Sequence, residues 1–215
     1  DCRHYHQELR AKRITEEDWA DLQNSIISSP GHCGVMGTAS TMAAIAEVIG
    51  IALPGNATIP ASDSRRLQLA ESAGRQIISL INANLKPSRL LTANSFKNAI
   101  RTLHAIGGST NGIIHLIAIA GRVGIHLPLT LFDELSKSTP LLLDVKPSGQ
   151  YLIEDFHNAG GLPALLNELS SLLALDMPTV TGQRLGKNIK GAQIRDSKVI
   201  RTINSEGGLA VLHGS

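Results

Sequence analysis

Residues 36–49 form an almost unbroken run of small and apolar side chains, in which Glu47 is the one charged residue. A helix of this composition has no polar face, so the rest of a domain has to cover it on all sides. Gly50 follows the run directly, and glycine is a common residue just past a helix C-terminus. The run therefore predicts a buried helix, whose small residues allow close packing around a site.

The composition is that of an ordinary globular protein. With 215 residues, of which 42% are hydrophobic and 18% charged, the chain is long enough for one or two domains. The net charge of +2 is spread without a run of Lys or Arg, so we expect neither nucleic acid nor a membrane surface as a partner. The longest apolar stretch, residues 112–120, is far shorter than the roughly 20 residues of a membrane span.

Cysteine usage and the two chain ends give further expectations. Cys2 and Cys33 cannot form a disulfide scaffold, and no signal segment opens the chain, so we expect a reducing compartment, the cytoplasm or an organelle matrix. The chain begins at Asp1 without a methionine, and it ends just after residues 207–212, an apolar segment typical of a strand. We expect both ends to be cuts within a longer protein.

Apolar periodicity and capping residues predict the remaining elements. The predicted helices cover residues 4–27, 63–81, 94–106, 113–123, 130–137 and 163–173, and the predicted strands cover 141–145, 199–203 and 209–212. The expected helix starts are capping boxes at Thr15 and Thr130, caps at Asp63 or Ser62 and at Asn94 or Ser95, and Pro163 as a first helical residue. The helix that follows Thr15 has Trp19, Leu22 and Ile26 on one side and is expected to pack on the main body.

Cys33 is the residue that most directly suggests chemistry. It precedes the predicted buried helix in a glycine-rich segment, and glycines let a bulky ligand approach the backbone. A helix N-terminus favours the thiolate, which is the form that binds metal or attacks carbon. The alternative is that Cys33 is a small buried apolar residue. A zinc site and a cysteine protease are rejected, because there is no Cys-x-x-Cys partner and spacing identifies no cooperating histidine.

A series of motifs covers nearly the whole chain. The motifs are residues 33–42, 53–60 with 63–66, 105–111 with His115, 140–149, 154–161, 179–182 and 207–212. In sequence and in order they resemble the dihydroxyacid dehydratase and phosphogluconate dehydratase family. The resemblance implies an α/β fold, in which residues 1–206 are part of a helix-rich, layered N-terminal dehydratase domain and residues 207–215 begin a β-rich C-terminal domain.

The same resemblance implies a hydro-lyase that uses an iron–sulfur cluster to convert a hydroxylated carboxylic acid to a 2-oxo acid. The family binds its cluster through three cysteines; Cys33 matches the last, in a Cys-x-x-Met motif, and Cys2 matches none. A 2Fe-2S cluster is expected rather than 4Fe-4S. The cluster iron would draw electrons from the leaving hydroxyl, Mg²⁺ would hold the carboxylate, and a base would take the C2 proton.

Other parts of the active site are expected outside this chain. The family's base and most of its Mg²⁺ ligands belong to motifs before residue 1 or after residue 215. The resemblance therefore implies no catalytic residue within the chain and no activity of the chain alone. The intact enzyme is expected to be a homo-oligomer, a dimer or tetramer.

The expected substrate-binding residues are Ser109, Thr110, Asn111, His115, Arg65 and Arg66. Residues 109–111 follow two glycines at a helix start, where free N–H groups can bind an anion, and the arginines suit bidentate contacts with a carboxylate or phosphate. Alternatives remain open for each group: a simple joint between two helices for 109–111, a core position for His115, and a solvated helix turn for the arginines.

The substrate class is read from small sequence differences. Residues 36–42 and 56–60 resemble the sugar-acid branch of the family, which favours an aldonic acid, and the alternative is a dihydroxyacid dehydratase of branched-chain amino-acid biosynthesis. An alternative of another class is a non-catalytic fragment or interaction domain that keeps the packing motifs and binds no cluster.

Overall fold

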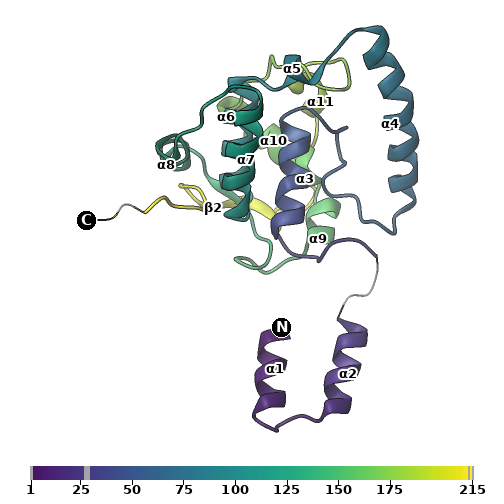
Figure 1. Ribbon diagram of the computed structural model, residues 1–215, viewed down its shortest axis with the longest axis vertical. Helices are drawn as coiled ribbons and strands as arrows, with labels where there is room; N and C mark the ends of the chain where they lie inside the picture. Colours follow the sequence, from purple (N-terminus) through teal and green to yellow (C-terminus); the bar gives the residue numbers. More distant parts are fainter. Residues whose placement is uncertain (1, 27–29, 213, 215) are drawn as a thin grey trace. The chain divides into compact units, whose positions relative to one another are not determined.

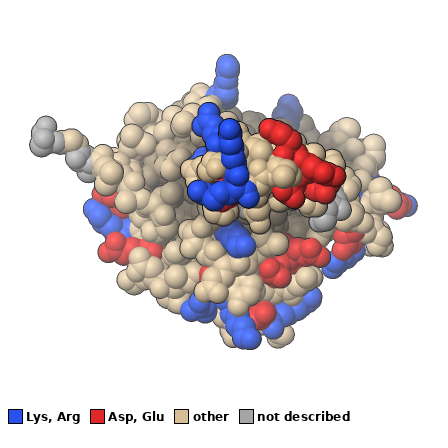
Figure 2. Space-filling view, turned by 90° about the horizontal axis from the view of Figure 1, so that it is seen from below, with Lys and Arg blue, Asp and Glu red and all other residues tan. Residues whose placement is uncertain are grey.

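The computed structural model describes residues 2–26, 30–212 and 214, and the chain divides into two compact units, residues 1–33 and 34–215 (Figure 1). Each unit is described by itself. Within the described ranges, no helix is both long and apolar enough to cross a membrane. Figure 2 shows basic and acidic side chains on the same face, with neither sign covering it.

The first unit contains two helices, α1 (Cys2–Arg10) and α2 (Glu16–Ser25). The capping box predicted at Thr15 is confirmed. Its hydroxyl accepts a hydrogen bond from the Asp18 N–H at 3.0 Å, and the Asp18 carboxylate accepts one from the Thr15 N–H at 2.8 Å. No residue of α2 is buried, so the packing of this helix on the main body stays a prediction.

The second unit is mostly helical, as predicted. Its elements are α3 (Thr38–Val48), α4 (Ser64–Asn82), α5 (Pro87–Leu90), α6 (Ala93–Ala105), α7 (Asn111–Arg122), α8 (Leu129–Lys137), β1 (Leu141–Leu143), α9 (Ile153–Asn158), α10 (Gly161–Glu168), the 3-10 helix η1 (Ser170–Leu172), α11 (Leu185–Ile189) and β2 (Ile200–Asn204). The short helices α5, α9 and α11 were not predicted, because an apolar period cannot be recognised over so few residues.

Helix α3 forms the centre of the core, next to α6 and α7 (Figure 1). Ile45 and Val48 are fully buried in α3, as are Ile100 and Leu103 in α6. The buried helix predicted from its small and apolar residues is confirmed. It starts at Thr38, two residues later than predicted, because Gly37 takes the N-cap position in an extended conformation.

Two glycines allow the connection from α6 to α7 to pass directly over α3. A Cβ atom on Gly108 would lie 2.7 Å from Leu103 Cδ1 and 3.0 Å from Thr41 Cγ2, and one on Gly112 would lie 2.9 Å from Leu103 Cδ1. These distances are shorter than carbon atoms tolerate. The glycines therefore fix how closely the start of α7 approaches α3.

Two helix starts differ from the predictions. Thr92, rather than Asn94 or Ser95, caps α6: its hydroxyl accepts from the Ser95 N–H at 3.3 Å, and Ser95 Oγ accepts from the Thr92 N–H at 2.8 Å. Helix α8 follows Pro128 without a side-chain cap, so the capping box predicted at Thr130 is wrong.

Helix α10 also differs from its prediction. It begins at Gly161, two residues before Pro163, and ends at Glu168 rather than at Leu173. Gly160, with φ of 119°, makes the sharp turn that permits the earlier start. The residues beyond Glu168 tighten into the 3-10 helix η1.

Strands β1 and β2 pair antiparallel, which confirms the strands predicted at 141–145 and 199–203. The strand predicted at 209–212 is wrong, because these residues are irregular. Just before them, the Gly207 N–H donates to the Ser136 carbonyl and the Gly208 N–H to the His104 carbonyl, each at 3.0 Å. The chain near 207 thus packs on α6 and α8, and a domain boundary there stays a prediction.

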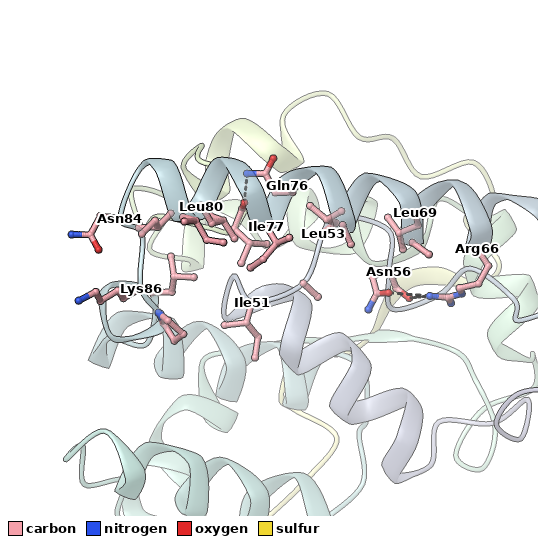
Figure 3. Close-up of a pocket in the computed structure, with 18 residues that line it drawn as sticks. Ile51, Leu53, Asn56, Arg66, Leu69, Gln76, Ile77, Leu80, Asn84 and Lys86 are labelled. Atoms are coloured by element: carbon pink, nitrogen blue, oxygen red, sulfur yellow. Dashed lines mark hydrogen bonds between the residues drawn. The ribbon is translucent and has the colours of Figure 1, made fainter.

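Helix α4 is capped as predicted by Asp63, whose carboxylate accepts from the Arg65 N–H at 2.8 Å. Its expected apolar face is nevertheless exposed: Leu67 is 77% and Ile81 67% accessible, and no residue of the helix is buried. Between α4 and residues 51–56 lies an apolar groove of about 750 Å³, toward which Ile77 and Leu80 project (Figure 3).

Candidate functional site

The structure brings the predicted residues 109–111 to the N-terminus of α3. The Asn111 side-chain amide donates to Thr38 Oγ1 at 2.8 Å, and Thr38 Oγ1 lies 3.3 Å from Ser109 Oγ. The Ser109 N–H donates to Thr41 Oγ1 at 2.9 Å. Thr38 and Thr41 are site residues that the sequence pattern does not single out, although both belong to the motif that begins at Cys33.

Two helix N-termini therefore meet at one polar cluster. Gly37 and Thr110 occupy the N-cap positions of α3 and α7, and neither provides a side-chain cap. In the part of the chain that the structure describes, the N–H groups of residues 38–40 have no hydrogen-bond acceptor. Uncapped N–H groups at a helix start attract anions. The cluster can accept a carboxylate or hydroxyl oxygen of a small ligand.

His115 lies one turn into α7 with its side chain exposed. The alternative prediction of a core histidine is therefore wrong, because α7 turns Leu116 and Ala120 toward the core instead. Ile114 and Ile117 are also exposed on this helix. A role of His115 in substrate binding stays a prediction.

Cys33 is a free, exposed cysteine, so the alternative of a small buried residue is wrong. The neighbouring His32 donates from Nδ1 to the Cys33 carbonyl at 2.8 Å, which leaves the thiol unengaged. The side chain of Cys2 lies outside the described residues. An iron–sulfur cluster needs several ligands, and no group of three His, Cys, Asp or Glu side chains in the described ranges could hold a metal. The role of Cys33 as one ligand of a cluster completed by residues outside this chain stays a prediction.

The residues directly after Cys33 are held in place by hydrogen bonds within the second unit. The Ile153 N–H, at the start of α9, donates to the Gly34 carbonyl at 2.9 Å, and the Met36 N–H donates to the Lys146 carbonyl at 2.7 Å. Ser40 Oγ donates to the Val35 carbonyl at 2.7 Å. The backbone between Cys33 and α3 is thus held by hydrogen bonds from two other segments and from α3 itself.

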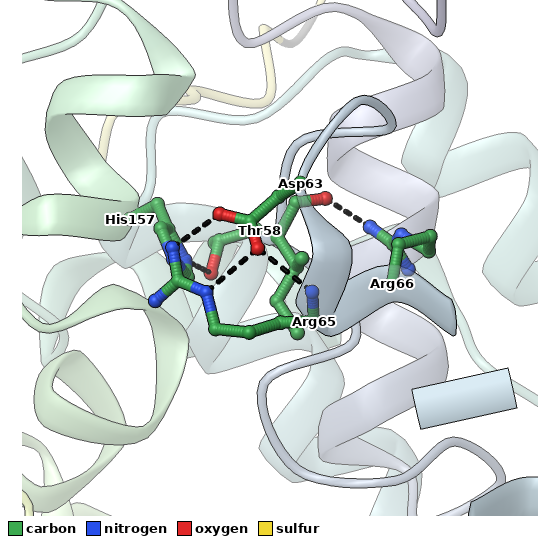
Figure 4. Close-up of polar contacts among 6 residues, drawn as sticks. Thr58, Asp63, Arg65, Arg66 and His157 are labelled. Atoms are coloured by element: carbon green, nitrogen blue, oxygen red, sulfur yellow. Dashed lines mark hydrogen bonds and ion pairs between the residues drawn. The ribbon is translucent and has the colours of Figure 1, made fainter. Parts of the chain in front are cut away.

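Arg65 and Arg66 lie at the start of α4, near Asp63 (Figure 4). Arg66 donates to the Asn56 side-chain oxygen at 2.9 Å and to the Ile59 carbonyl, so it holds the loop before the helix. Arg65 pairs with Asp63, and the guanidinium holds the pKa of that carboxyl well below its usual range. Neither arginine bonds to residues 109–111 within the described ranges, and their role in substrate binding stays a prediction.

Glu47 is a buried acidic residue that the sequence analysis noted only as an exception in an apolar run. Its carboxylate accepts hydrogen bonds from the Gly55 and Ala57 N–H groups, both at 2.8 Å. Burial raises the pKa of Glu47 to about 7, against the opposing effect of these two bonds. The contacts fix the 53–58 loop on α3 and explain why one acid interrupts this helix.

Comparison with known proteins places the chain among dehydratases. A family model described as dihydroxy-acid/6-phosphogluconate dehydratase N-terminal matches residues 1–188. The dihydroxy-acid dehydratase of Caldanaerobacter subterraneus subsp. tengcongensis is 45% identical over 213 residues, which cover 96% of this chain and 38% of that protein. The dihydroxy-acid dehydratase of Ignicoccus hospitalis is 40% identical over 205 residues, which cover 93% of this chain and 37% of that protein.

The chain therefore spans about 38% of the length of the curated relatives it matches. The family model, by contrast, covers most of this chain, including Cys33 and the cluster at the starts of α3 and α7. The chain belongs to the dihydroxy-acid/6-phosphogluconate dehydratase family.

Proposed function

We propose that the intact protein is a hydro-lyase that removes water from a 2,3-dihydroxy carboxylic acid to give a 2-oxo acid. Membership of the family and the names of the matched relatives support this reaction. The structural observation that carries it is the polar cluster of Thr38, Ser109 and Asn111, where the uncapped start of α3 meets the start of α7, close in sequence to a free cysteine.

Cys33 would be one ligand of an iron–sulfur cluster, which we propose to be 2Fe-2S, with further ligands and most Mg²⁺ ligands from residues outside this chain. When bound, such a cluster supplies Lewis-acid chemistry to a leaving hydroxyl group. The thiolate is the form that binds iron, and the exposed Cys33 side chain is accessible for it.

The chain's own contribution would be to bind and orient the substrate. The Ser109 hydroxyl and Asn111 amide can donate to substrate oxygens, and the N–H groups at the start of α3 favour a negatively charged carboxylate. Holding the acid in one orientation lowers the entropic cost of the reaction. We assign no catalytic base to this chain, and we expect it to be inactive alone.

Two substrate branches remain as proposals. The matched relatives are named dihydroxy-acid dehydratases, which favours a short branched 2,3-dihydroxy acid. Residues 36–42 favour an aldonic acid of the sugar-acid branch. Turnover of each acid by the intact enzyme separates them. We further propose a cytoplasmic homo-oligomer without nucleic-acid or membrane partners.

The function is tested by the Cys33→Ser substitution in the intact protein. Wild type, the variant and a Cys2→Ser control are reconstituted with iron and sulfide without oxygen, and visible absorbance, bound iron and 2-oxo acid formation are measured. We expect Cys33→Ser to lose most cluster absorbance and at least about 100-fold in turnover, since a thiolate ligand is missing.

The Cys2→Ser control should match wild type. Full cluster content and turnover in Cys33→Ser would contradict the assignment of Cys33. If even the wild type binds no cluster and forms no 2-oxo acid, the alternative of a non-catalytic interaction domain is favoured.

A further inference from the structure

A second polar feature of the domain is a small pocket of about 160 Å³ beside the start of α4. Its lining includes Gly55, Thr58, Arg65, His157, Gly160 and Arg195. At about 30 Å³ for each water molecule, the space holds roughly five waters. It is therefore large enough for one small ion.

The walls of the pocket come from α9 and α10. His157, in the last turn of α9, has its Nδ1 atom 3.1 Å from Thr58 Oγ1 (Figure 4). Thr58 Oγ1 lies close to Gly161, the first residue of α10. A Cβ atom added to Gly161 would be only 2.7 Å from this oxygen. Gly160 gives α10 no side-chain cap. The Thr58 hydroxyl thus lies where α9 ends and α10 begins.

Arg195 is held at the pocket by its backbone and not by its side chain. The Arg195 N–H donates to the Ala159 carbonyl at 2.8 Å. Gly160 packs closely on residues 193–195, since a Cβ atom added to it would lie 2.5 Å from the Gln193 carbonyl oxygen. Among the described residues, the Arg195 guanidinium has no hydrogen-bond or ion-pair partner. Its charge is available to a ligand.

The charges around the pocket are predominantly positive. The charged groups that act on His157 are Arg65, Arg66 and Arg195, opposed by the carboxylate of Asp63. Burial first and then the nearby guanidinium groups lower the pKa of His157, as expected in a positive field. Asp63 neutralises Arg65 through a close ion pair, so an excess of positive charge remains.

We propose that this pocket binds one small oxyanion, best represented by phosphate, through Arg195, Arg65 and the Thr58 hydroxyl. Guanidinium groups pair with phosphate through two parallel hydrogen bonds, and a hydroxyl group adds a further donor. The anion is either free phosphate or the phosphate group of a larger metabolite. The binding requires no cluster, so it is independent of the proposed dehydratase reaction.

The test is calorimetric titration of the intact protein with inorganic phosphate, in wild type and in Arg195→Gln. Arg89→Gln is the matched control, because Arg89 is an exposed arginine on α5 away from the pocket. We expect Arg195→Gln to weaken phosphate binding about tenfold and Arg89→Gln to leave it unchanged. Absence of binding to wild type, or equal affinity of Arg195→Gln, would overturn the proposal.

A second variant tests whether weaker phosphate binding by Arg195→Gln could result from misfolding. Asp63→Asn keeps a residue suited to capping α4 but removes the carboxylate that competes for Arg65. We expect phosphate to bind about fivefold more tightly, a gain that a damaged fold cannot produce. Unchanged or weaker binding would contradict the assignment of Arg65.

Methyl phosphate distinguishes the two sources of the anion. Binding as tight as that of inorganic phosphate supports a phosphate group on a larger metabolite, whereas binding of inorganic phosphate alone supports the free ion. The readout involves no turnover. A Cys33→Ser protein that loses activity but still binds phosphate would separate this site from the dehydratase proposal.

Discussion

Helices α3 and α4 both present apolar side chains that prefer to leave water, but their surroundings differ completely. α3 has 11 residues, and six of them are buried, including Thr41 and Glu47. α4 has 19 residues, and none is buried. An apolar stripe therefore identifies the face that prefers to leave water, while burial depends on which elements lie next to it.

The two helices also differ in how closely neighbours approach them. The small residues of α3 and the glycines of the α6–α7 connection permit contact at van der Waals distance. α4 instead borders a groove of about 750 Å³, and a hydrogen bond of 2.6 Å from the Gln76 side chain to the Val180 carbonyl links it to the domain. The contrast predicts different responses to the same substitution in the two helices.

The largest expected difference is for an isoleucine-to-alanine change. Ile45→Ala in α3 removes a fully buried side chain from a packed core, so we expect the free energy of unfolding to fall by about 3–4 kcal/mol. Ile78→Ala in α4 should change it by less than about 0.5 kcal/mol, because Ile78 is 58% exposed. Urea unfolding of both variants measures the two changes. Equal losses in the free energy of unfolding would contradict the contrast between α3 and α4.

The next difference concerns acidic residues and pH. The pKa of Glu47 in α3 is raised from 4.5 to about 7 in the folded state, so the unfolded state loses this proton first. Stability from Glu47 is present below pH 4.5 and is lost as the pH rises through 7. A shift of this size corresponds to about 3 kcal/mol.

Glu47→Gln removes this titration. Between pH 5 and 8, the stability of the variant relative to wild type should increase by about 2.5 kcal/mol, most of the full effect. Glu71→Gln in α4 is the control, since Glu71 is exposed and pairs with Arg75 on the surface. Denaturant unfolding at several pH values measures both. A parallel pH profile of Glu47→Gln and wild type would show that the acid is not held neutral.

The smallest expected difference is for glycine-to-alanine changes. Gly112→Ala places a Cβ atom 2.9 Å from Leu103 Cδ1, and we expect a loss of about 1–3 kcal/mol. Gly74→Ala in the middle of α4 meets no atom within 4 Å, and we expect a gain of about 0.5–1 kcal/mol. Thermal unfolding of both variants shows whether each substitution lowers or raises the stability. If Gly74→Ala also destabilises, α4 is more closely packed than its exposure indicates.

Much of the fold could be predicted from the sequence because its signals are local. The capping box at Thr15, the Asp63 cap and the glycine after α3 each act within a few residues. The predicted strand at 209–212 was wrong, because a strand needs a partner and the sequence does not specify one. The start of α10 was missed by two residues, since the left-handed turn at Gly160 was not considered.

The candidate site was predicted only in part. Residues 109–111 were selected for their position after two glycines, but their contacts with Thr38 and Thr41 join positions about 70 residues apart. Arg195 and His157 were missed as site residues. His157 belongs to a recognised motif, whereas nothing in the sequence near Arg195 signals a ligand.

The sequence by itself determined the helix-rich character of the chain, the buried nature of α3, and the family resemblance from which Cys33 is proposed as a cluster ligand. These follow from composition, periodicity and motif order, which are properties of neighbouring residues. The tertiary structure alone decided which apolar faces are covered, that Glu47 is a buried acid, and that Arg195 lies beside Thr58 and His157. The burial of a side chain and the charges around it depend on contacts between segments far apart in the sequence. Neighbouring residues alone therefore do not predict them.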